Sequence, residues 1–428
     1  MKSRCASIID IVAQYAENCA SLFEQRELVA QSLTYPSTLN DLDELDNRID
    51  AQLDGLRMSG EDGWRIASEA LEVGKPGEIF TVGVLAFEQP DKDSFGSTST
   101  ETLLNGISVP EKAVRALSLA LDWISNDRFA VVVDQLKSEG SALSQAVVTT
   151  ACASRGLKCA AEIRLALESN CSYVFKAGCW AAARLRHRDV LALIEEQLRA
   201  RTAETQYEAA WAALLLGSPK ATSALRELAV QAPVATAEMA AIALFHAVPP
   251  RLALSLHHDL LVDIGSCRAT IKAAGAAGTP EMLPFILEQL DQPSVARLAG
   301  ESFSAITGLD LEEAGLTTAP LLPEVSSPND DPEDENTSLD VDEALSWPNR
   351  PSIEKWWQDH ARHFLSFTRY LRGSVVSEGV LRENIRTGFQ RYRTAAAQLF
   401  AISGGQVFDT TAPAFRQLQR LSAEERWR

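Results

Sequence analysis

The stretch GTPEMLPFILEQLDQPSVARLAGESFSAITGLDL, residues 278–311, repeats a pattern from earlier in the chain. Residues 187–219 read HRDVLALIEEQLRARTAETQYEAAWAALLLGSP. In both stretches a short apolar segment ends in Glu-Gln-Leu (288–290 and 196–198), a polar break follows, and the next segment is rich in Ala. Apolar residues at three- and four-residue steps indicate helices, so each stretch predicts a pair of helices.

Similar pairs recur between residues 111 and 309 at steps of about 30 residues, a period typical of α-solenoids. Each unit of a solenoid needs neighbours to bury its apolar face, and Ala, Gly and Cys in the second helices allow close packing. We therefore predict an all-α fold with a HEAT-like α-solenoid over residues 111–316. The apolar centres of the first helices fall near Leu165, Ile194, Leu225, Leu254 and Ile286, and Trp180 and Trp211 take matching places in the second helices.

Residues 1–110 predict a helical amino-terminal cap. A stripe from Leu42 to Leu56 alternates with a charged face, and Thr38 followed by Asp41 resembles a capping box. The stretch DKDSFGSTSTETLLNG (91–106) is rich in Gly, Ser and Thr, which predicts a loop. FAVVVDQL (129–136) could be a strand, but it continues the helical spacing around it and is predicted to be helical.

Residues 317–352 contain six Pro, and from Glu324 to Glu343 nine acidic residues occur without Lys or Arg. Such a composition buries too little apolar surface to order itself, which predicts a flexible acidic linker. Residues 353–428 read as two or three short helices rich in aromatic residues and Arg, and could cap the solenoid.

The formal net charge of the 428-residue chain is −18, which argues against a nucleic-acid binder because phosphate contacts need clustered Lys and Arg. Residues 353–428 hold 12 Lys and Arg against 7 Asp and Glu, or +5, which leaves −23 for residues 1–352. No run of 18 apolar residues predicts a membrane span, and the first 23 residues lack a signal-peptide core. The seven unpaired-looking Cys indicate a reducing compartment, so we expect a cytoplasmic protein.

The search for reaction chemistry finds little. His360 and His363 lie one helical turn apart, but Asp359 is their only evident partner, so a solvated helix face is favoured over a metal site. Cys152, Cys159, Cys171 and Cys179 lack the short Cys-x-x-Cys spacing of a zinc site. The chain contains none of the nucleotide-binding or nucleophile motifs that we considered. We expect no catalytic residue, no cofactor and no metal.

Aromatic and Arg side chains interleave in one region, and these residue types dominate binding hot spots. Three interpretations stay open: the set docks the tail onto the last repeat, it binds a partner protein, or it stacks on single-stranded nucleic acid, which the acidic charge disfavours. The candidate partner-binding residues are Trp347, Trp356, Trp357, Arg362, Arg369, Tyr370 and Arg372, with Phe364 and Phe367 beside them.

The unit length and second helices such as EAAWAALLLG (208–217) resemble HEAT repeats of the short type found in phycobilin-lyase-like proteins. The flanks AQYAENCASLFEQR (13–26), WPNRPSIEKWWQDHARHF (347–364) and FDTTAPAFRQ (408–417) are similar to a proteobacterial family of HEAT-repeat proteins. This resemblance implies an accessory role in type VI secretion. Tyr15 stands where that family often has His, so no role of that His is carried over.

These observations favour a non-enzymatic scaffold or adaptor that binds a protein partner, with no nucleic acid and no membrane insertion. The alternatives are a HEAT-repeat enzyme of the lyase type or a metal-binding protein, which would show a bound metal or an absorbing cofactor after purification. A self-assembling structural protein would instead show a mass that depends on concentration.

Overall fold

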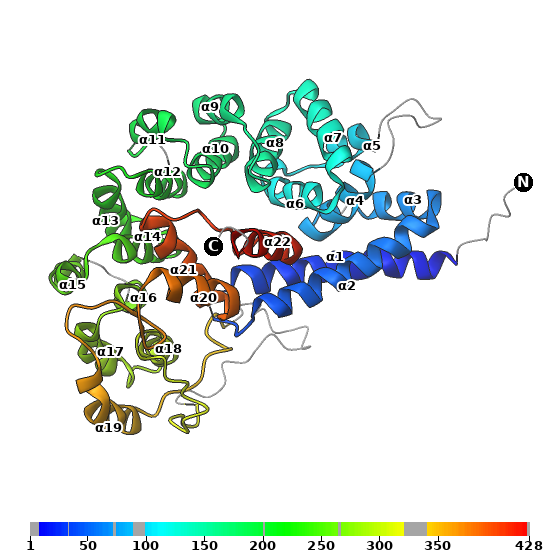
Figure 1. Ribbon diagram of the computed structural model, residues 1–428. Coiled ribbons are helices and arrows are strands. Elements are labelled where there is room, and N and C mark those ends of the chain that lie inside the picture. The colour runs from blue at the N-terminus through cyan, green and yellow to red at the C-terminus, as the bar shows by residue number, and fades with distance from the viewer. Residues whose placement is uncertain are drawn as a thin grey trace, which may run out of the picture. The chain divides into compact units, whose positions relative to one another are not determined.

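The computed structural model describes residues 8–32, 34–71, 74–88, 99–199, 202–263, 267–320 and 340–425. Over these residues the chain is predominantly helical (Figure 1) and has a single two-stranded hairpin, which confirms the predicted all-α class. None of the helices in these ranges combines the length and the apolar character needed to cross a membrane. The chain divides into two compact units.

The first unit takes its described residues from the ranges 1–31, 37–193 and 409–428, so the end of the chain belongs with its beginning. Its helices are α1 (Ile9–Gln31), α2 (Leu39–Ser59), α3 (Glu61–Ala70), α4 (Pro76–Glu88), α5 (Ser99–Gly106), α6 (Pro110–Trp123), α7 (Asn126–Glu139), α8 (Ala142–Ser154), α9 (Ala160–Glu168), α10 (Ser172–Arg184), the 3-10 helix η1 (Arg188–Val190) and α22 (Ala414–Glu425).

The second unit consists of the described parts of 32–36 and 194–408, and α11 crosses its boundary. Its helices are α11 (Leu191–Glu196), α12 (Ala203–Leu216), α13 (Ala221–Gln231), α14 (Val234–Ala247), α15 (Pro250–Asp263), α16 (Cys267–Ala277), η2 (Pro280–Met282), α17 (Leu283–Gln289), α18 (Ala296–Thr307), α19 (Arg350–His360), η3 (Ala361–His363), α20 (Glu378–Thr387) and α21 (Gln390–Ile402). The antiparallel strands β1 (Tyr370–Leu371) and β2 (Ser374–Val375) pair Tyr370 with Val375 and Leu371 with Ser374.

The two stretches with the shared sequence pattern have the same local structure. In each, a 3-10 turn (η1 or η2) leads into a short α-helix (α11 or α17), and an Ala-containing helix follows (α12 or α18). The Leu of each Glu-Gln-Leu triplet, Leu198 or Leu290, is buried. The repeated letters therefore encode a repeated helix pair.

The core of the first unit forms where α1, α4 and α6 meet. Phe23 and Phe80 stack with ring centroids 4.2 Å apart, and Trp123 meets Phe80 edge-on at 5.0 Å. A Cβ atom on Gly77 would lie 2.2 Å from the Ala20 carbonyl oxygen, so only Gly allows α4 to approach α1 this closely. At the start of α2, the Thr38 hydroxyl accepts the Asp41 N–H and the Asp41 carboxylate accepts the Thr38 N–H, which confirms the capping box.

Small side chains line the packing of the later helices. Ala146 of α8, Ala166 of α9 and Ala177 of α10 share one buried cluster. A Cβ atom on Gly178 would lie 3.0 Å from the Ala166 methyl group, so α9 and α10 lie close together. FAVVVDQL lies within α7, as predicted from its helical spacing.

Three local predictions are wrong. The second half of the predicted loop 91–106 forms α5, while residues 91–98 lie outside the described ranges. Leu165 is 58% exposed because Ile163 and Ala166 occupy the buried face of α9. The two-residue strands β1 and β2 were not predicted, since they are too short to show alternation.

The structure also differs from the predicted linker at its ends. Asp342 is buried and receives two hydrogen bonds from Arg268, at 2.5 and 2.9 Å. The Thr318 N–H donates to the Trp347 carbonyl at 2.9 Å, and Thr317 forms an isolated antiparallel bridge with Pro348. Residues 321–339, which carry most of the predicted linker, lie outside the described ranges.

Replacing Phe80 by Ala removes a fully buried ring from the contact of α4 with α1 and α6. We expect Phe80→Ala to lower the free energy of unfolding by about 3–5 kcal/mol. Met58→Ala truncates a side chain of the same unit that is 90% exposed. This control should change the free energy of unfolding by less than about 0.5 kcal/mol. Urea denaturation measures both values, and equal losses in the two variants would contradict this view of the core.

Candidate functional site

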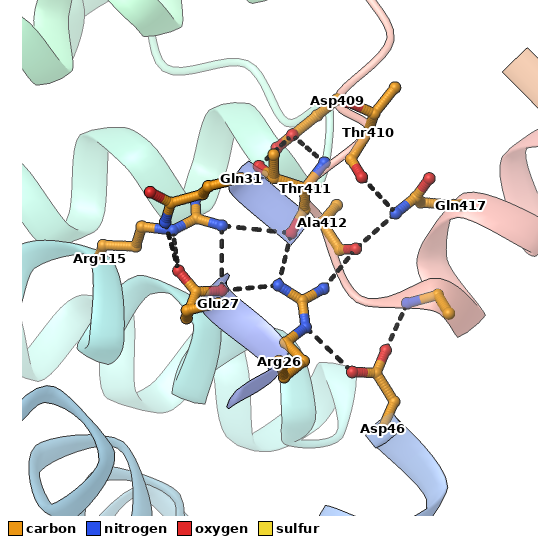
Figure 2. Close-up of polar contacts among 11 residues, drawn as sticks. Arg26, Glu27, Gln31, Asp46, Arg115, Asp409, Thr410, Thr411, Ala412 and Gln417 are labelled. Carbon is orange, nitrogen blue, oxygen red and sulfur yellow. Dashed lines mark hydrogen bonds and ion pairs between the residues drawn. The ribbon is translucent and has the colours of Figure 1, made fainter. Parts of the chain in front are cut away.

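A fully buried arginine, Arg26 of α1, forms the centre of a polar cluster in the first unit (Figure 2). Its Nε donates to Asp46 Oδ1 at 3.1 Å. Its Nη1 donates to Glu27 Oε1 and to the Thr411 carbonyl, and its Nη2 donates to the Ala412 carbonyl, each at 2.7 Å. One guanidinium therefore joins α1, α2 and the carboxy-terminal segment.

The helical periodicity places these groups. Arg26 follows Phe23 by three residues and precedes Ala30 by four, so it lies on the buried face of α1. Asp46 lies on the buried stripe of α2 beside Leu42 and Ile49, although the sequence predicted charged residues only on the opposite face. Its Oδ2 accepts the Ala414 N–H at 2.6 Å.

Glu27 and Arg115 form a second set of charged groups beside Arg26. Glu27 accepts a hydrogen bond from Arg115 of α6 and one from Gln31 at 3.0 Å, and Arg115 donates at 3.2 Å to the Thr411 carbonyl. Burial alone would raise the pKa of Glu27. The opposite effect of Arg115 and Arg26 is larger, so the pKa of Glu27 lies below its ordinary value. Burial likewise lowers the pKa of Arg26, but Asp46 and Glu27 raise it above its ordinary value. These directions favour the charged forms of Arg26 and Glu27, whereas burial raises the pKa of Asp46 in spite of Arg26 and the Ala414 N–H.

The carboxy-terminal segment is shaped to meet this cluster. Asp409 accepts from the N–H and hydroxyl of Thr411, and Gln417 donates to the Thr410 and Ala412 carbonyls, at 3.0 and 2.7 Å. These bonds hold an irregular turn before α22 and direct its carbonyls towards Arg26 (Figure 2).

Further contacts extend the docking along α22. Phe415 meets Trp123 edge-on at 5.6 Å, and Arg416 donates to the Asp122 carbonyl at 2.8 Å. What this site recognises is mostly peptide backbone: the Thr411 and Ala412 carbonyls and the Ala414 N–H, with one aromatic contact. The arrangement binds a peptide segment, and in this structure that segment is residues 409–417 of the chain itself.

The aromatic candidates predicted from the sequence all lie in the second unit. Most of them form two groups of neighbouring rings, and Trp347 lies apart. Trp356 contacts Phe303 of α18 edge-on at 5.8 Å and stacks on His360 at 4.3 Å. Trp357, Phe364 and Tyr370 form a chain of rings 5.3 and 5.0 Å apart. Trp347 lies apart from both groups, under the guanidinium of Arg297 at 4.7 Å.

Arg369 binds the carbonyls at the ends of two helices. It donates to Phe245, His246 and Val248 at the end of α14, each at 2.7 Å, and to Ala277 at the end of α16 at 3.0 Å. Burial lowers its pKa to about 10. These carbonyls have no partner within their helices, so Arg369 supplies it. Of the remaining candidates, Arg362 and Arg372 are exposed and Phe367 is 48% exposed.

These contacts agree with the interpretation that the aromatic and Arg set docks the tail within the chain. Trp356, Arg369 and Tyr370 contact α14, α16, α18 or the residue after α16, where the Tyr370 N–H donates to Gly278 at 2.7 Å. The exposed side chains Arg362 and Arg372 remain accessible to a ligand.

Three of the four cysteines that were considered as zinc ligands have the character of packing residues. Cys152, Cys159 and Cys179 are buried, and burial raises the pKa of Cys152 to about 11 and that of Cys159 to about 12, which disfavours the thiolate. Within the described ranges no three His, Cys, Asp or Glu side chains gather into a possible metal site. His360 and His363 have ring centroids 5.9 Å apart, and the Nδ1 of His360 bonds to the Trp356 carbonyl at 2.7 Å.

No family model, curated protein or solved structure matches this chain.

Arg26, Asp46, Glu27 and Arg115 are not among the residues predicted from the sequence. A usable signal was present: Arg26 and Asp46 both occupy positions on an otherwise apolar helical stripe. Buried charges are paired, so two such positions of opposite sign indicate one ion pair. The backbone partners at 411 and 412 had no signal of this kind.

Replacing Arg26 by Gln leaves Asp46 buried without its cation and the Ala412 carbonyl without this donor. We expect Arg26→Gln to lower the free energy of unfolding by about 3–5 kcal/mol and to increase hydrogen exchange at the Ala414 amide. Arg65→Gln breaks an exposed pair with Glu69 in the same unit and should cost less than about 1 kcal/mol. We call the bonds of Arg26 and Asp46 to the backbone of residues 411, 412 and 414 the clamp. Unchanged exchange at the Ala414 amide in Arg26→Gln would contradict it.

His246 provides a pH test of the second unit. It is buried 2.9 Å from Gln398, and burial together with Arg369 lowers its pKa to about 4, from an ordinary value near 6.5. Below pH 6.5 the imidazole of His246 is protonated in the unfolded chain but stays neutral in the folded chain. The free energy of unfolding therefore decreases as the pH is lowered. From pH 7 to pH 5 this group should cost about 2 kcal/mol.

Urea denaturation at pH 7, 6 and 5 measures this effect. His246→Gln should remove about 2 kcal/mol of the pH dependence, whereas His258→Gln, at an exposed neighbour, should keep it. A pH dependence in His246→Gln equal to that of the natural chain would show that another group is responsible.

Proposed function

We propose that this chain is a non-enzymatic cytoplasmic scaffold or adaptor, which binds a partner protein along a HEAT-like α-solenoid of helix pairs. The proposal starts from the order of packing. In the second unit the second helices contact each other in sequence: α12 with α14, α14 with α16, and α16 with α18.

The first helices follow the same order. Glu195 of α11 accepts from Lys220, at the start of α13, at 2.7 Å. Arg226 of α13 lies 4.0 Å from Asp263 of α15. The ring of His257 on α15 lies 4.6 Å from that of Phe285 on α17. Two parallel rows of helices, each joined to its neighbours, support a solenoid with one row facing outward.

A repeated acidic position on the outward row is the observation that carries the proposal. Each of its four helices in the second unit has an exposed acid two residues after a fully buried side chain. Two residues correspond to about 200° around a helix, so the acids lie opposite the core. We call this set the acidic ladder: Glu196, Glu227, Asp259 and Glu288, which follow Ile194, Leu225, His257 and Ile286.

The ladder differs from the other acids of these helices in its contacts. Glu195 and Asp263 are used in the ion pairs that join successive helices. The four ladder acids form no ion pair or side-chain hydrogen bond with any residue that the structure describes. Asp134 of α7 and Glu168 of α9, in the first unit, also follow buried residues by two and are exposed.

Unpaired like charges repeated at one unit length attract a partner of opposite charge and raise its association rate. We therefore infer a partner protein with a basic segment. The resemblance of the flanking sequences supports a component or effector of type VI secretion as that partner, with this chain acting as adaptor, chaperone or regulator.

The test uses the full chain as bait in extracts of the cells that make it, with mass spectrometry to identify the partner. We expect a partner with a basic segment, and retention that weakens in 1 M salt because exposed charge contacts are screened there. The variant Glu196→Gln, Glu227→Gln, Asp259→Asn, Glu288→Gln should raise the dissociation constant by about tenfold, which corresponds to about 0.3–0.4 kcal/mol for each of the four exposed contacts.

A matched control removes the same charge from exposed acids of the same unit outside the ladder, and it should bind like the natural chain. Its positions are Glu313, Glu343, Asp359 and Glu383. Equal binding by the ladder variant and the natural chain, or retention unaffected by 1 M salt, would refute the acidic surface.

A further inference from the structure

A pocket of about 290 Å³ in the second unit lies at the carboxy-terminal end of α18 and the start of α21. Three arginines from three different elements border it: Arg297 of α18, Arg372 of the β1–β2 turn and Arg391 of α21. The rings of Phe389 and Tyr392 form part of its wall. Neither the aromatic docking nor the acidic ladder explains this pocket.

The fold holds Arg372 in place through its backbone. Arg372 and Gly373 form the turn of the hairpin, with φ of 51° and 74°. Their N–H groups donate to the Ala305 and Ile306 carbonyls of α18, at 2.7 and 3.1 Å. A left-handed turn position of this kind favours Gly, Asn or Asp, so an arginine is disfavoured there on backbone grounds.

The guanidinium of Arg372 has rings beside it but no acceptor. It lies 5.2 Å from the centroid of Tyr392 and 5.9 Å from that of Phe389. Within the described ranges it makes no hydrogen bond and no ion pair, so its N–H donors are free for a ligand.

Arg391 stacks on the same two rings, at 4.9 Å from Tyr392 and 5.1 Å from Phe389. Its Nε donates to Glu301 at 2.5 Å, and its Nη1 donates to the Thr34 carbonyl at 3.1 Å, which fixes the side chain.

Arg297 is fixed in a similar way from the other side. It bonds to Asp340 through one Nη atom and lies over Trp347. Three acids also line the pocket, and each already has a partner. Glu301 accepts from Arg391, Asp310 from the N–H groups of Glu312 and Glu313 at 2.9 and 3.0 Å, and Glu312 from the Ser346 hydroxyl at 2.7 Å. The arginine N–H donors that remain unused in this pocket can therefore bind a ligand that carries hydrogen-bond acceptors.

We propose that this pocket binds a small oxyanion, a phosphate or carboxylate group of a small molecule, with Arg372 as the main contact. Guanidinium groups bind both kinds of group through paired N–H donors, and stacking on rings orients those donors before the ligand arrives. The cavity volume is near the lower end of small-molecule sites, which fits a ligand of a few heavy atoms.

The test is isothermal titration calorimetry on the full chain at constant ionic strength, with inorganic phosphate in one arm and succinate in the other. Arg372→Asn is the variant of choice because Asn suits the turn, so the hairpin should keep its fold while the guanidinium is lost. Arg362→Asn is the matched control, since Arg362 is an exposed arginine of the same unit outside the pocket.

We expect the natural chain and Arg362→Asn to bind one of the two anions, and Arg372→Asn to bind it at least tenfold more weakly with an unchanged melting temperature. Tighter binding of phosphate assigns the site to phosphate groups, and tighter binding of succinate assigns it to carboxylates. Absence of binding by the natural chain, or equal loss in both variants, overturns the proposal. None of the acidic ladder residues lines this pocket, so neither result bears on the proposed binding of a basic partner.

Discussion

Close approach between helices is the constraint on which the rest of this structure depends. A buried Ala removes little apolar surface from water, so helices rich in Ala gain stability only when many of them pack tightly. The absent side chains of Gly77 and Gly178 show how tight the packing is, since a Cβ atom at either position would contact the next helix at 3.0 Å or less.

At the helix ends, buried arginines solve the problem that close packing creates. The last carbonyls of a helix have no partner inside it, and tight packing keeps water away from them. Arg369 meets this need for α14 and α16, and Arg155 donates to the Ile124 carbonyl after α6 at 2.9 Å. Arg26 does the same for an irregular segment. A planar group with five donors can join several carbonyls at once, which a lysine cannot do as well.

The sequence was informative where the structure is local. The helix pairs, the Thr38–Asp41 capping box and the helical state of 129–136 all follow from residue spacing within one element. It was less informative where partners come from distant parts of the chain. Asp342, in a stretch predicted to be a flexible linker, is ordered by Arg268, and no local pattern indicates that pairing.

The candidate sites show the same limit. Trp356 and Arg369 were identified from residue type alone, but their contacts with Phe303 and with the end of α14 depend on the tertiary fold. Arg26 and Asp46 could have been found as charges on apolar stripes, whereas the carbonyls of Thr411 and Ala412 look like any others in a sequence. The ladder acids became distinct only when burial and pairing separated them from their neighbours.

The clamp also sets an order of events during synthesis on the ribosome. Arg26 is separated by 385 and 386 residues from the two carbonyls that it binds. When α1 leaves the exit tunnel, those acceptors have not been translated, and the guanidinium must stay hydrated until they arrive. Helix α1 is therefore made long before its contacts are complete, and a polypeptide that ends before residue 409 leaves Arg26 without these acceptors.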